Sequence, residues 1–336
     1  MGTKADLNQA RVNKKDEFYT LTETIEKELR NYKEQFKGQR IYCPCDDARW
    51  SNFWWYFFCN FNHLGLKSLD ASCFHAGQHG EHWHYEGGCP TEDIRKAVWE
   101  KDRSKVFKYC DYEVLEDEGG FQNRADILVK TDVVVTNPPF SLLKDFVPFI
   151  IEHGNKILFL SNTNCLTYKS IFPYIKEGKL WAGYDFHKTV EFIMADDYEL
   201  KGKAYIDDDG KKHGFVQSIS WFTNLKTKKL SKIYECYQRY DPNIHKHYDN
   251  SEVINVDYVK QIPCDWTGVM GVPITWLDKY CPEQFEIVRD CRWENSDKYE
   301  CVIDGVTTYW RIFIRWKPEA MPEIRKTEDG EIVVYN

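Results

Sequence analysis

The stretch DVVVTNPPF, residues 132–140, decides the fold that we expect for this chain. Its run of β-branched residues predicts a buried strand of a parallel sheet. The chain must then leave the sheet at Asn137, because the prolines that follow have no N–H with which to continue strand pairing. A helical pattern over 141–153 and a second apolar run over 156–160 come next. Strand, helix and strand in this order predict a βαβ unit of a doubly wound sheet.

A second unit of this kind is predicted near the N-terminus. Residues 40–44 form its first strand, and residues 66–74 form the next. Between them Ser51 is suited to cap a helix that ends at Gly65. Another helix is predicted over 21–36, ahead of the first strand.

Further elements are predicted up to residue 225: a loop over 75–92, a short helix from Thr91, a strand over 108–115, a helix over 168–176 and a strand over 214–225. After residue 225 the chain changes to short strand-like pieces between loops. We therefore expect an α/β fold, with a doubly wound, mostly parallel sheet in residues 1–225 and a smaller C-terminal α+β region in residues 226–336. The polar first 15 residues are expected to have no packed structure.

The composition is typical of a globular protein in a reducing compartment. Hydrophobic residues are 42% and charged residues 29% of the 336 positions. No apolar run reaches the roughly 18 residues that a membrane helix needs, and no secretory signal is recognisable, so we expect a cytoplasmic protein that does not bind membranes. The twelve cysteines are accordingly expected as thiols. The net charge of −8 argues against a surface that is basic throughout but allows a local basic groove.

The tetrapeptide Asn137-Pro138-Pro139-Phe140 can form a ligand site at the carboxyl end of its strand, where such sheets bind ligands. The prolines fix the backbone, so that the side-chain oxygen of Asn137 and the carbonyl of Pro138 can accept two hydrogen bonds from one exocyclic amine. Phe140 offers a flat face on which a base could stack, worth about 1–3 kcal/mol. An ordinary Asn-Pro turn is the alternative, but the apolar strand, the second proline and the aromatic residue favour a ligand site.

This tetrapeptide and other stretches resemble the EcoRI-type adenine-specific DNA methyltransferases. The similar stretches keep their order and are DEFYT (16–20), IYCPCDDARWSNF (41–53), LGLKSL (64–69), DVVVTNPPFS (132–141), WFTNL (221–225) and GVPITWLDKYCPEQFEI (271–287). The resemblance implies the class I S-adenosylmethionine methyltransferase fold, with a target-recognition region at the C-terminal end. It also implies a site-specific enzyme of a restriction-modification system, which methylates the N6 amine of an adenine flipped out of duplex DNA. Asn137, Pro138, Pro139 and Phe140 would be its catalytic residues.

The same resemblance implies an S-adenosylmethionine site. The residues that it nominates are Phe18, Tyr19, Thr20, Cys43, Asp46, Asp47, Asn52, Phe53, Glu118 and Phe121. Asp46 or Asp47 could face the positively charged amino group of the cofactor, although both could instead be surface acids. The chain departs from the family in lacking a glycine-rich turn after the first strand. It also carries Gly120 where relatives carry Asp, so Glu118 is expected to hold the adenosine in its place, with Phe121 stacking on it.

Basic residues are expected to contact DNA phosphates. Eight lysines against three aspartates lie between Lys201 and Lys232, and residues 310–317 alternate cations with apolar side chains as a strand with one basic face would. An ordinary solvated strand face is the alternative. The nominated residues are Lys226, Lys228, Lys229, Arg311, Arg315 and Lys317.

Metal-binding residue types gather at His79, His82, His84 and Cys89, but their spacing fits no established zinc pattern. A polar loop is therefore preferred to an ion site, and no metal is expected. Double-stranded DNA is the expected partner, with no obligate protein partner, and the pattern is compatible with a monomer. A catalytically inactive DNA-binding protein of the same fold is the alternative, motivated by the missing glycine turn and by Gly120.

Overall fold

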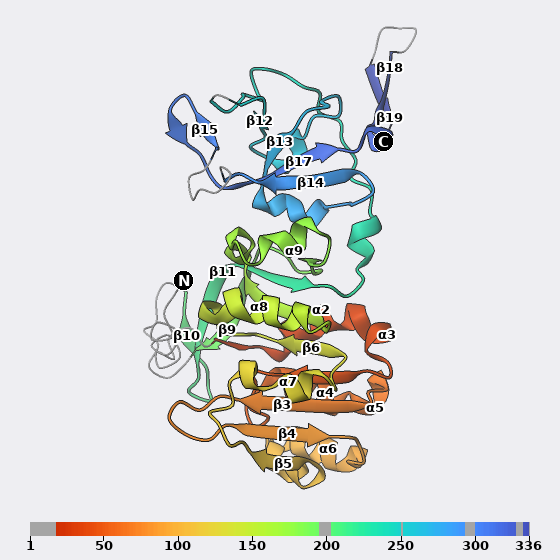
Figure 1. Ribbon diagram of the computed structural model, residues 1–336. Helices are drawn as coiled ribbons and strands as arrows, with labels where there is room; N and C mark the ends of the chain where they lie inside the picture. The colour runs from red at the N-terminus through yellow and green to blue at the C-terminus, as the bar shows by residue number, and fades with distance from the viewer. Residues whose placement is uncertain (1–17, 195–202, 250, 293–299, 327–331, 336) are drawn as a thin grey trace. The chain divides into compact units, whose positions relative to one another are not determined.

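The computed structural model describes residues 18–194, 203–249, 251–292, 300–326 and 332–335 (Figure 1). The chain forms two compact units, the first from residues 1–165 and 182–225, the second from residues 166–181 and 226–336. The first 15 residues, which the sequence predicts to be without packed structure, lie outside the described residues. Among the described residues, no helix combines the length and the apolar character that crossing a membrane requires.

The first unit is built on a large mixed sheet, which has eleven strands among the described residues. Its main path runs β1-β9-β11-β7-β6-β2-β3-β4-β5, and β8 and β10 pair with β11. The strands are β1 (Phe18–Thr20), β2 (Arg40–Cys43), β3 (Ser68–Cys73), β4 (Glu81–Tyr85), β5 (Asp111–Val114), β6 (Val133–Thr136), β7 (Lys156–Asn162), β8 (Trp181–Ala182), β9 (Lys188–Met194), β10 (Tyr205–Ile206) and β11 (Lys212–Thr223). The α/β class and the predicted strands at 40–44, 66–74, 132–136 and 156–160 are confirmed.

The expectation of a mostly parallel sheet is wrong. Only the central strands β7, β6, β2 and β3 pair in parallel with one another, and antiparallel strands extend the sheet on both sides. The predicted loop over 75–92 is also wrong, because β4 lies within it, between β3 and β5 (Figure 1). Trp83 and Tyr85 of β4 are buried, whereas His82 and His84 both bond to Asp70 on β3. Buried aromatic residues thus alternate with histidines along β4. Because the stretch is rich in polar residues, its sequence indicated a loop.

Helices connect the strands of the first unit. They are α2 (Thr22–Leu29), α3 (Lys33–Phe36), α4 (Asn52–Cys59), α5 (Phe61–Leu64), α6 (Thr91–Trp99), α7 (Ala125–Leu128) and α8 (Leu143–Glu152), with 3₁₀ turns η2 (Arg30–Tyr32), η3 (Arg103–Tyr109), η4 (Phe121–Asn123), η5 (Phe140–Leu142) and η6 (Thr163–Thr167). The predicted helix over 21–36 is interrupted by η2, and the one that begins after Ser51 is divided at Asn60. The predicted caps are confirmed. The Ser51 side chain accepts hydrogen bonds from the N–H groups of Phe53 and Trp54 in the first turn of α4, and Gly65 has a left-handed φ of 62°.

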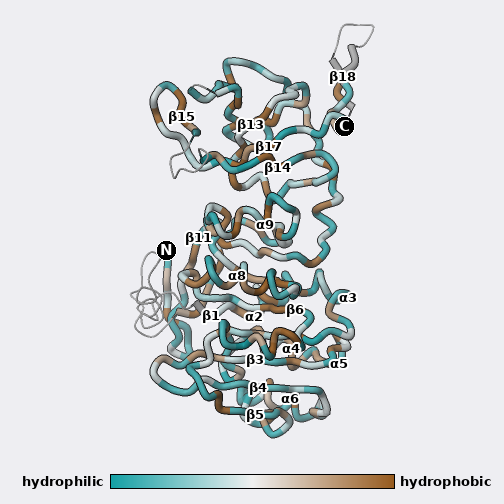
Figure 2. The backbone as a smooth tube through the Cα atoms, viewed as in Figure 1, coloured by the Kyte–Doolittle hydropathy of each residue, from teal (hydrophilic) through white to brown (hydrophobic). Residues whose placement is uncertain are grey.

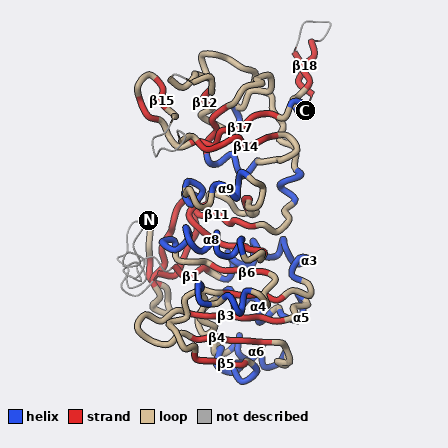
Figure 3. The backbone as a smooth tube through the Cα atoms, in the orientation of Figure 1, coloured by secondary structure: helices blue, strands red, loops and turns tan. Residues whose placement is uncertain are grey.

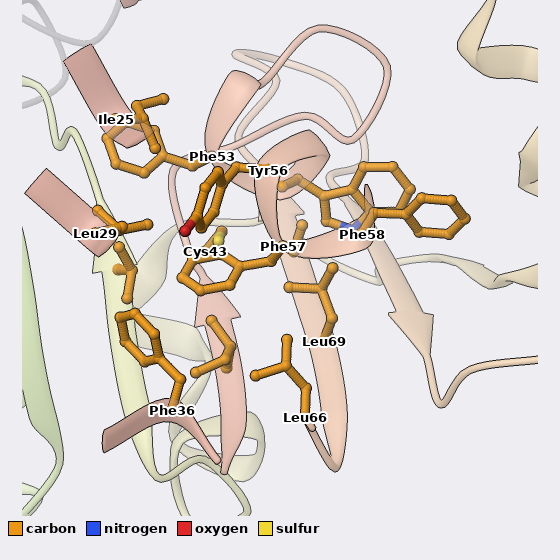
Figure 4. Packing of buried hydrophobic residues seen from close by; sticks show 14 of the residues in the cluster. Ile25, Leu29, Phe36, Cys43, Phe53, Tyr56, Phe57, Phe58, Leu66 and Leu69 are labelled. Atoms are coloured by element: carbon orange, nitrogen blue, oxygen red, sulfur yellow. The ribbon is translucent and has the colours of Figure 1, made fainter. Parts of the chain in front are cut away.

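Aromatic side chains of α4 fill the core of the first unit. Phe57 is fully buried, and its ring meets that of Phe36 edge to face with centroids 5.3 Å apart. In Figure 4 the same ring lies among Leu29, Cys43 and Leu69. Hydrophobic residues also concentrate along α4 and α8 in Figure 2. This packing attaches α4 to the sheet and so fixes the loop that leads from β2 into the helix.

The second unit is mainly strand and loop (Figure 3). A four-stranded sheet runs β12-β13-β17-β14, and two hairpins pair β15 with β16 and β18 with β19. The elements are α9 (Phe172–Lys176), β12 (Ile254–Asn255), β13 (Met270–Pro273), β14 (Phe285–Asp290), β15 (Val302–Ile303), β16 (Val306–Thr307), β17 (Arg311–Trp316), β18 (Glu323–Lys326) and β19 (Ile332–Tyr335), with 3₁₀ turns η7 (Lys228–Ser231), η8 (Val259–Gln261), η9 (Ile274–Lys279) and η10 (Pro318–Ala320).

Residues 166–181 group with the second unit, although the sequence analysis assigned them to the first part of the chain. Helix α9 packs on β14, and the ring of Phe172 meets that of Trp310 edge to face at 5.7 Å. The guanidinium of Arg292 donates a hydrogen bond of 2.9 Å to the carbonyl of Thr167. These contacts join residues more than a hundred positions apart, so no local pattern could reveal them.

We predict that Phe57→Ala lowers the free energy of unfolding by about 3–5 kcal/mol, because it leaves a cavity in a closely packed core. Trp99→Ala is the matched control, since this helical side chain is 88% exposed, and its effect should stay within about 0.5 kcal/mol. Urea unfolding followed by circular dichroism measures both variants. Equal midpoints for the two variants would contradict the assigned core.

Candidate active site

A cavity of about 420 Å³ opens where the central parallel strands end. The carboxyl ends of β2, β3 and β6 lie at one edge of the sheet, so the loops that follow these strands meet there. The lining residues are Tyr19, Thr20, Pro44, Cys45, Asp46, Asp47, Trp50, Ser51, Asn52, Phe53, Cys73, Phe74, His75, Ala76, Gln78, Gly119, Gly120, Phe121, Asn137, Pro138, Pro139, Ser141 and Leu142.

Asn137 is positioned by a contact with β1, the strand at one end of the sheet path. It follows the last residue of β6, and its Nδ2 donates to Thr20 Oγ1 at 3.3 Å. The carbonyl of Thr20 in turn accepts a bond of 2.8 Å from Asn52 Nδ2. Since a side-chain amide nitrogen only donates, the acceptor role toward a ligand falls to the Asn137 amide oxygen. Pro138 and Pro139 also line the cavity, so three residues of the motif face it.

Asp46 is a buried acid held by hydroxyl groups. Its carboxylate accepts bonds of 2.6 Å from Ser51 Oγ and 2.8 Å from Thr136 Oγ1. Burial raises the pKa of Asp46 to about 6, and the two hydroxyl bonds only partly oppose this effect. Ser51 also caps α4, so one carboxylate connects the end of β2, the end of β6 and the start of α4.

Asp47 has a different environment, because it pairs with a guanidinium. Arg49 Nε donates to Asp47 Oδ1 at 2.9 Å, and an Arg49 terminal nitrogen donates to Oδ2 at 2.7 Å. The same guanidinium bonds Glu81 on β4. Of the two acids in this loop, Asp46 therefore lacks a salt bridge among the described residues, and Asp47 has one.

Aromatic rings stand at several places around the cavity. Tyr19 and Trp50 line the cavity and are 43% and 68% exposed, so part of each ring can contact a flat ligand. Phe121 is buried and meets the ring of Phe146 edge to face at 5.1 Å. Trp50 was not among the residues nominated from the sequence, and the signal available for it was its position between the loop acids and the helix cap Ser51.

Some nominated residues are not in the lining. Cys43 is fully buried in the hydrophobic core, and Phe140 is half-buried and packs against that core. Glu118 is exposed and accepts a bond of 3.2 Å from the N–H of Gly77. Phe18 begins β1, where it pairs with Met194 of β9.

Glycines next to Glu118 form the cavity wall in its place. Gly119 has a φ of +81°, and a Cβ there would collide with the carbonyl oxygen of Cys73. Gly119, Gly120 and Phe121 all line the cavity. The close approach of the two backbones explains why this segment contributes its backbone rather than the Glu118 carboxylate.

The nominated basic residues divide by exposure. Lys226 and Lys228 are exposed, Lys229 bonds Asp278, and Arg315 is exposed and pairs with Glu286 at 2.7 Å. A further nominated residue, Lys317, is half-buried.

The alternation over 310–317 predicts that Arg311 lies on an exposed basic face, and this prediction is wrong. Its side chain is 7% exposed and bonds Asn255 Oδ1 at 3.3 Å, with Asp257 at 3.4 Å. The strand itself is confirmed as β17, but one end of its predicted basic face packs inside the second unit.

The histidines of the predicted polar loop bond to an acid instead of to one another. Asp70 Oδ1 accepts His82 Nε2 at 2.9 Å and His84 Nδ1 at 2.8 Å. The Asp70 carboxylate raises the pKa of His84 to about 9. Within the described part of the chain, His79, His82, His84 and Cys89 form no metal-binding group.

The arrangement combines acceptors on a rigid turn, a buried acid and open aromatic faces in one cavity. Such a set suits a ligand with an amine, a flat ring and a positive charge.

Comparison with known proteins supports a specific family. The profile of the family described as "Adenine-specific methyltransferase EcoRI" matches residues 6–317. No solved structure matches the chain.

Three curated relatives are similar over most of their length. Type II methyltransferase M.EcoRI of Escherichia coli is 38% identical over 93% of this chain and 96% of its own. Type II methyltransferase M.MpnI of Mycoplasma pneumoniae is 36% identical, and M.MgeORF184P of Mycoplasma genitalium is 35% identical, each over 84% of this chain and 85% of the relative. The chain therefore belongs to the EcoRI family of adenine-specific methyltransferases.

Proposed function

We propose that this protein is a site-specific DNA methyltransferase of a restriction-modification system that transfers a methyl group from S-adenosylmethionine to the N6 amine of adenine in double-stranded DNA. Family membership supports the reaction class. The observation that carries the proposal is the position of Asn137, Pro138 and Pro139 on a cavity at the carboxyl ends of the parallel strands. Adenine presents an exocyclic amine with two N–H donors, which is the group that two fixed acceptors would bind.

The target amine would be held by the Asn137 side-chain oxygen and the Pro138 carbonyl. Both prolines restrict the backbone, so the two acceptors do not have to be ordered when the base arrives. The adenine must first leave the duplex, which costs a few kcal/mol. Phe140, the last residue of the motif, is half-buried against the core, and its open part would stack on the extruded ring and recover about 1–3 kcal/mol of this cost.

The residues around the cavity fit S-adenosylmethionine by their chemistry. A buried acid, Asp46, suits the cationic amino-acid end of this cofactor, and the faces of Tyr19, Trp50 and Phe121 suit its adenine. Thr20 and Asn52, bonded to each other, would close the site next to Asn137. Phe53 completes the lining at the start of α4. When bound, S-adenosylmethionine supplies a methyl group made electrophilic by a positively charged sulfur.

The chain's own contribution would be to orient the amine. Hydrogen bonds from the amine to Asn137 and Pro138 favour a tetrahedral nitrogen with its lone pair localised. Correct orientation of two reactants can supply up to about 7–11 kcal/mol. The amine becomes acidic only after it has gained the methyl group, and its proton can then leave to water. No strong general base is needed among the lining residues.

The two sequence departures that favoured a catalytically inactive DNA-binding protein do not disrupt the cavity. The loop after β2 has no glycine-rich turn, yet its residues line the cavity together with Asn137. Gly120 also lines the cavity, so the departure at this position leaves the wall in place. All twelve cysteines are free thiols. This agrees with our proposal that the enzyme works in the cytoplasm, where its DNA substrate is located. We also propose that it acts as a monomer without an obligate partner.

We predict that Asn137→Ala lowers methyl transfer to duplex DNA by at least about 100-fold, because one of the two acceptors that orient the amine is lost. Cofactor affinity should change little, since this acceptor serves the base. Tritium transfer from labelled S-adenosylmethionine and calorimetric cofactor titration measure the two quantities. Asn31→Ala, at an exposed position on the turn η2, is the control. Retention of transfer by Asn137→Ala would overturn the proposed role.

We predict that cofactor affinity falls as the pH is lowered through about 6. Since burial raises the pKa of Asp46 to about 6, the carboxyl becomes neutral below this value and no longer attracts a cation. The affinity should then fall about tenfold per pH unit. Asp46→Asn should remove this dependence, whereas Asp47→Asn should keep it. Calorimetric titrations between pH 5 and 7.5 test this, and an unchanged profile in Asp46→Asn would contradict it.

We further propose that exposed cations of the second unit contact DNA phosphates. Lys228→Ala should weaken binding equally for all DNA sequences and reduce the slope of log affinity against log salt by about 0.9. Lys101→Ala is the control, because Lys101 is 80% exposed and pairs with Asp209 in the first unit. Fluorescence anisotropy at several salt concentrations measures both. Identical slopes for the Lys228 variant and the unmodified protein would exclude this contact.

A further inference from the structure

Four side chains with metal-binding groups meet at the rim of the cavity. Cys73 ends β3, and Glu81 begins β4 as its direct partner in the strand register. His75 follows β3, and Asp47 comes from the loop after β2. One ligand atom from each residue lies within 4.8 Å of the others. Glu81 lies within the histidine-rich stretch 79–89, but none of the four is a residue that the sequence offered as a metal candidate.

The three closest ligand atoms have the spacing of a tetrahedral zinc site. Cys73 Sγ lies 3.2 Å from His75 Nε2 and 3.6 Å from Glu81 Oε2, and the latter two atoms are 3.5 Å apart. A zinc ion about 2.3 Å from sulfur and about 2.0–2.1 Å from nitrogen and oxygen separates such atoms by about 3.4–3.6 Å. These three atoms thus need to move little to share one ion.

The hairpin that carries these ligands is held in place by a neighbouring segment. The N–H of His75 donates to the carbonyl of Glu118 at 3.1 Å, and the N–H of Gly80 donates to that of Asp117 at 2.7 Å. Gly80 and Gly119 pack so closely that a Cβ on Gly80 would collide with the Gly119 backbone. The ligands are therefore preorganised by contacts outside the group itself.

The charges of the group can also accommodate a divalent ion. Arg49 bonds both Asp47 and Glu81, so it contributes one positive charge next to two carboxylates. Metal binding displaces the proton of the Cys73 thiol, which leaves to water. The resulting thiolate and the two carboxylates would then balance Arg49 and the ion.

We propose that Cys73, His75 and Glu81, with Asp47 beside them, form a site for Zn²⁺ or a similar borderline divalent metal, and that a bound metal competes with the cofactor. Cys73, His75 and Asp47 line the cavity. Without the ion, Asp47, Glu81 and Arg49 leave this part of the wall with one negative charge. The bound ion and the thiolate cancel that charge, so a cationic cofactor is attracted less. The competition rests on the proposed function, whereas the metal site does not.

Cobalt binding tests the site directly. With a non-thiol reductant present, Co²⁺ alone should bind one ion per chain and give a thiolate-to-cobalt charge-transfer band. Cys73→Ser should lose the band, and His75→Gln should weaken binding at least about tenfold. Two controls should keep both the band and the cobalt affinity. They are Cys45→Ser, which removes a second thiol on the cavity, and His79→Gln, which removes an exposed histidine of the same hairpin. No band in the unmodified protein, or a band that survives in Cys73→Ser, overturns the site.

A cofactor titration with and without Zn²⁺ tests the competition. Zn²⁺ should raise the Kd for S-adenosylmethionine about tenfold or more in the unmodified protein. His75→Gln should need at least about tenfold more Zn²⁺ for the same effect. This variant also covers the case in which Cys73→Ser does not fold, because His75 is one-third exposed. An unchanged Kd while zinc is bound overturns the competition. If the metal-free protein binds no cofactor, the proposed function fails, and the cobalt spectrum still decides the metal site.

Discussion

The carboxylate of Asp46 is buried between the hydroxyl groups of Ser51 and Thr136, and the geometry of the cavity depends on these two bonds. Ser51 begins the helix α4, and Thr136 is the residue before Asn137. A buried carboxylate is costly to leave without partners, so the strand ends and the helix are held together. The bond from Asn137 to Thr20 adds a strand from the far side of the sheet. The turn that carries Asn137 is thus restrained from two directions.

Much of the central sheet was predictable because its signals are local. The β-branched run of β6 and the prolines after it, the cap Ser51 and the terminator Gly65 each act within a few residues. Strand β4 was not predictable in this way, since its histidines are satisfied by Asp70, a partner on another strand. The grouping of residues 166–181 with distant strands was hidden for the same reason.

The site divides in a similar way. Asp46 and Asn137 could be found because a strand end and a motif mark them, and both line the cavity. Glu118 was a poor choice because the fold requires its neighbour Gly119 to approach the Cys73 backbone, which places main chain at the wall. Trp50 carries no motif of its own. Its one signal in the sequence is its position between the loop acids and Ser51, and its place on the cavity depends on how the loop after β2 is held.

The interleaved order of the two units constrains how this family can evolve. Since the second unit is assembled from residues 166–181 and 226–336, strands β9 and β11 of the first unit are encoded between its two pieces. A single recombination crossover at residue 225 would leave α9 with a foreign β14 as its packing partner. Genetic exchange of the second unit between relatives must therefore transfer both segments together, or be followed by compensating substitutions where α9 meets its sheet.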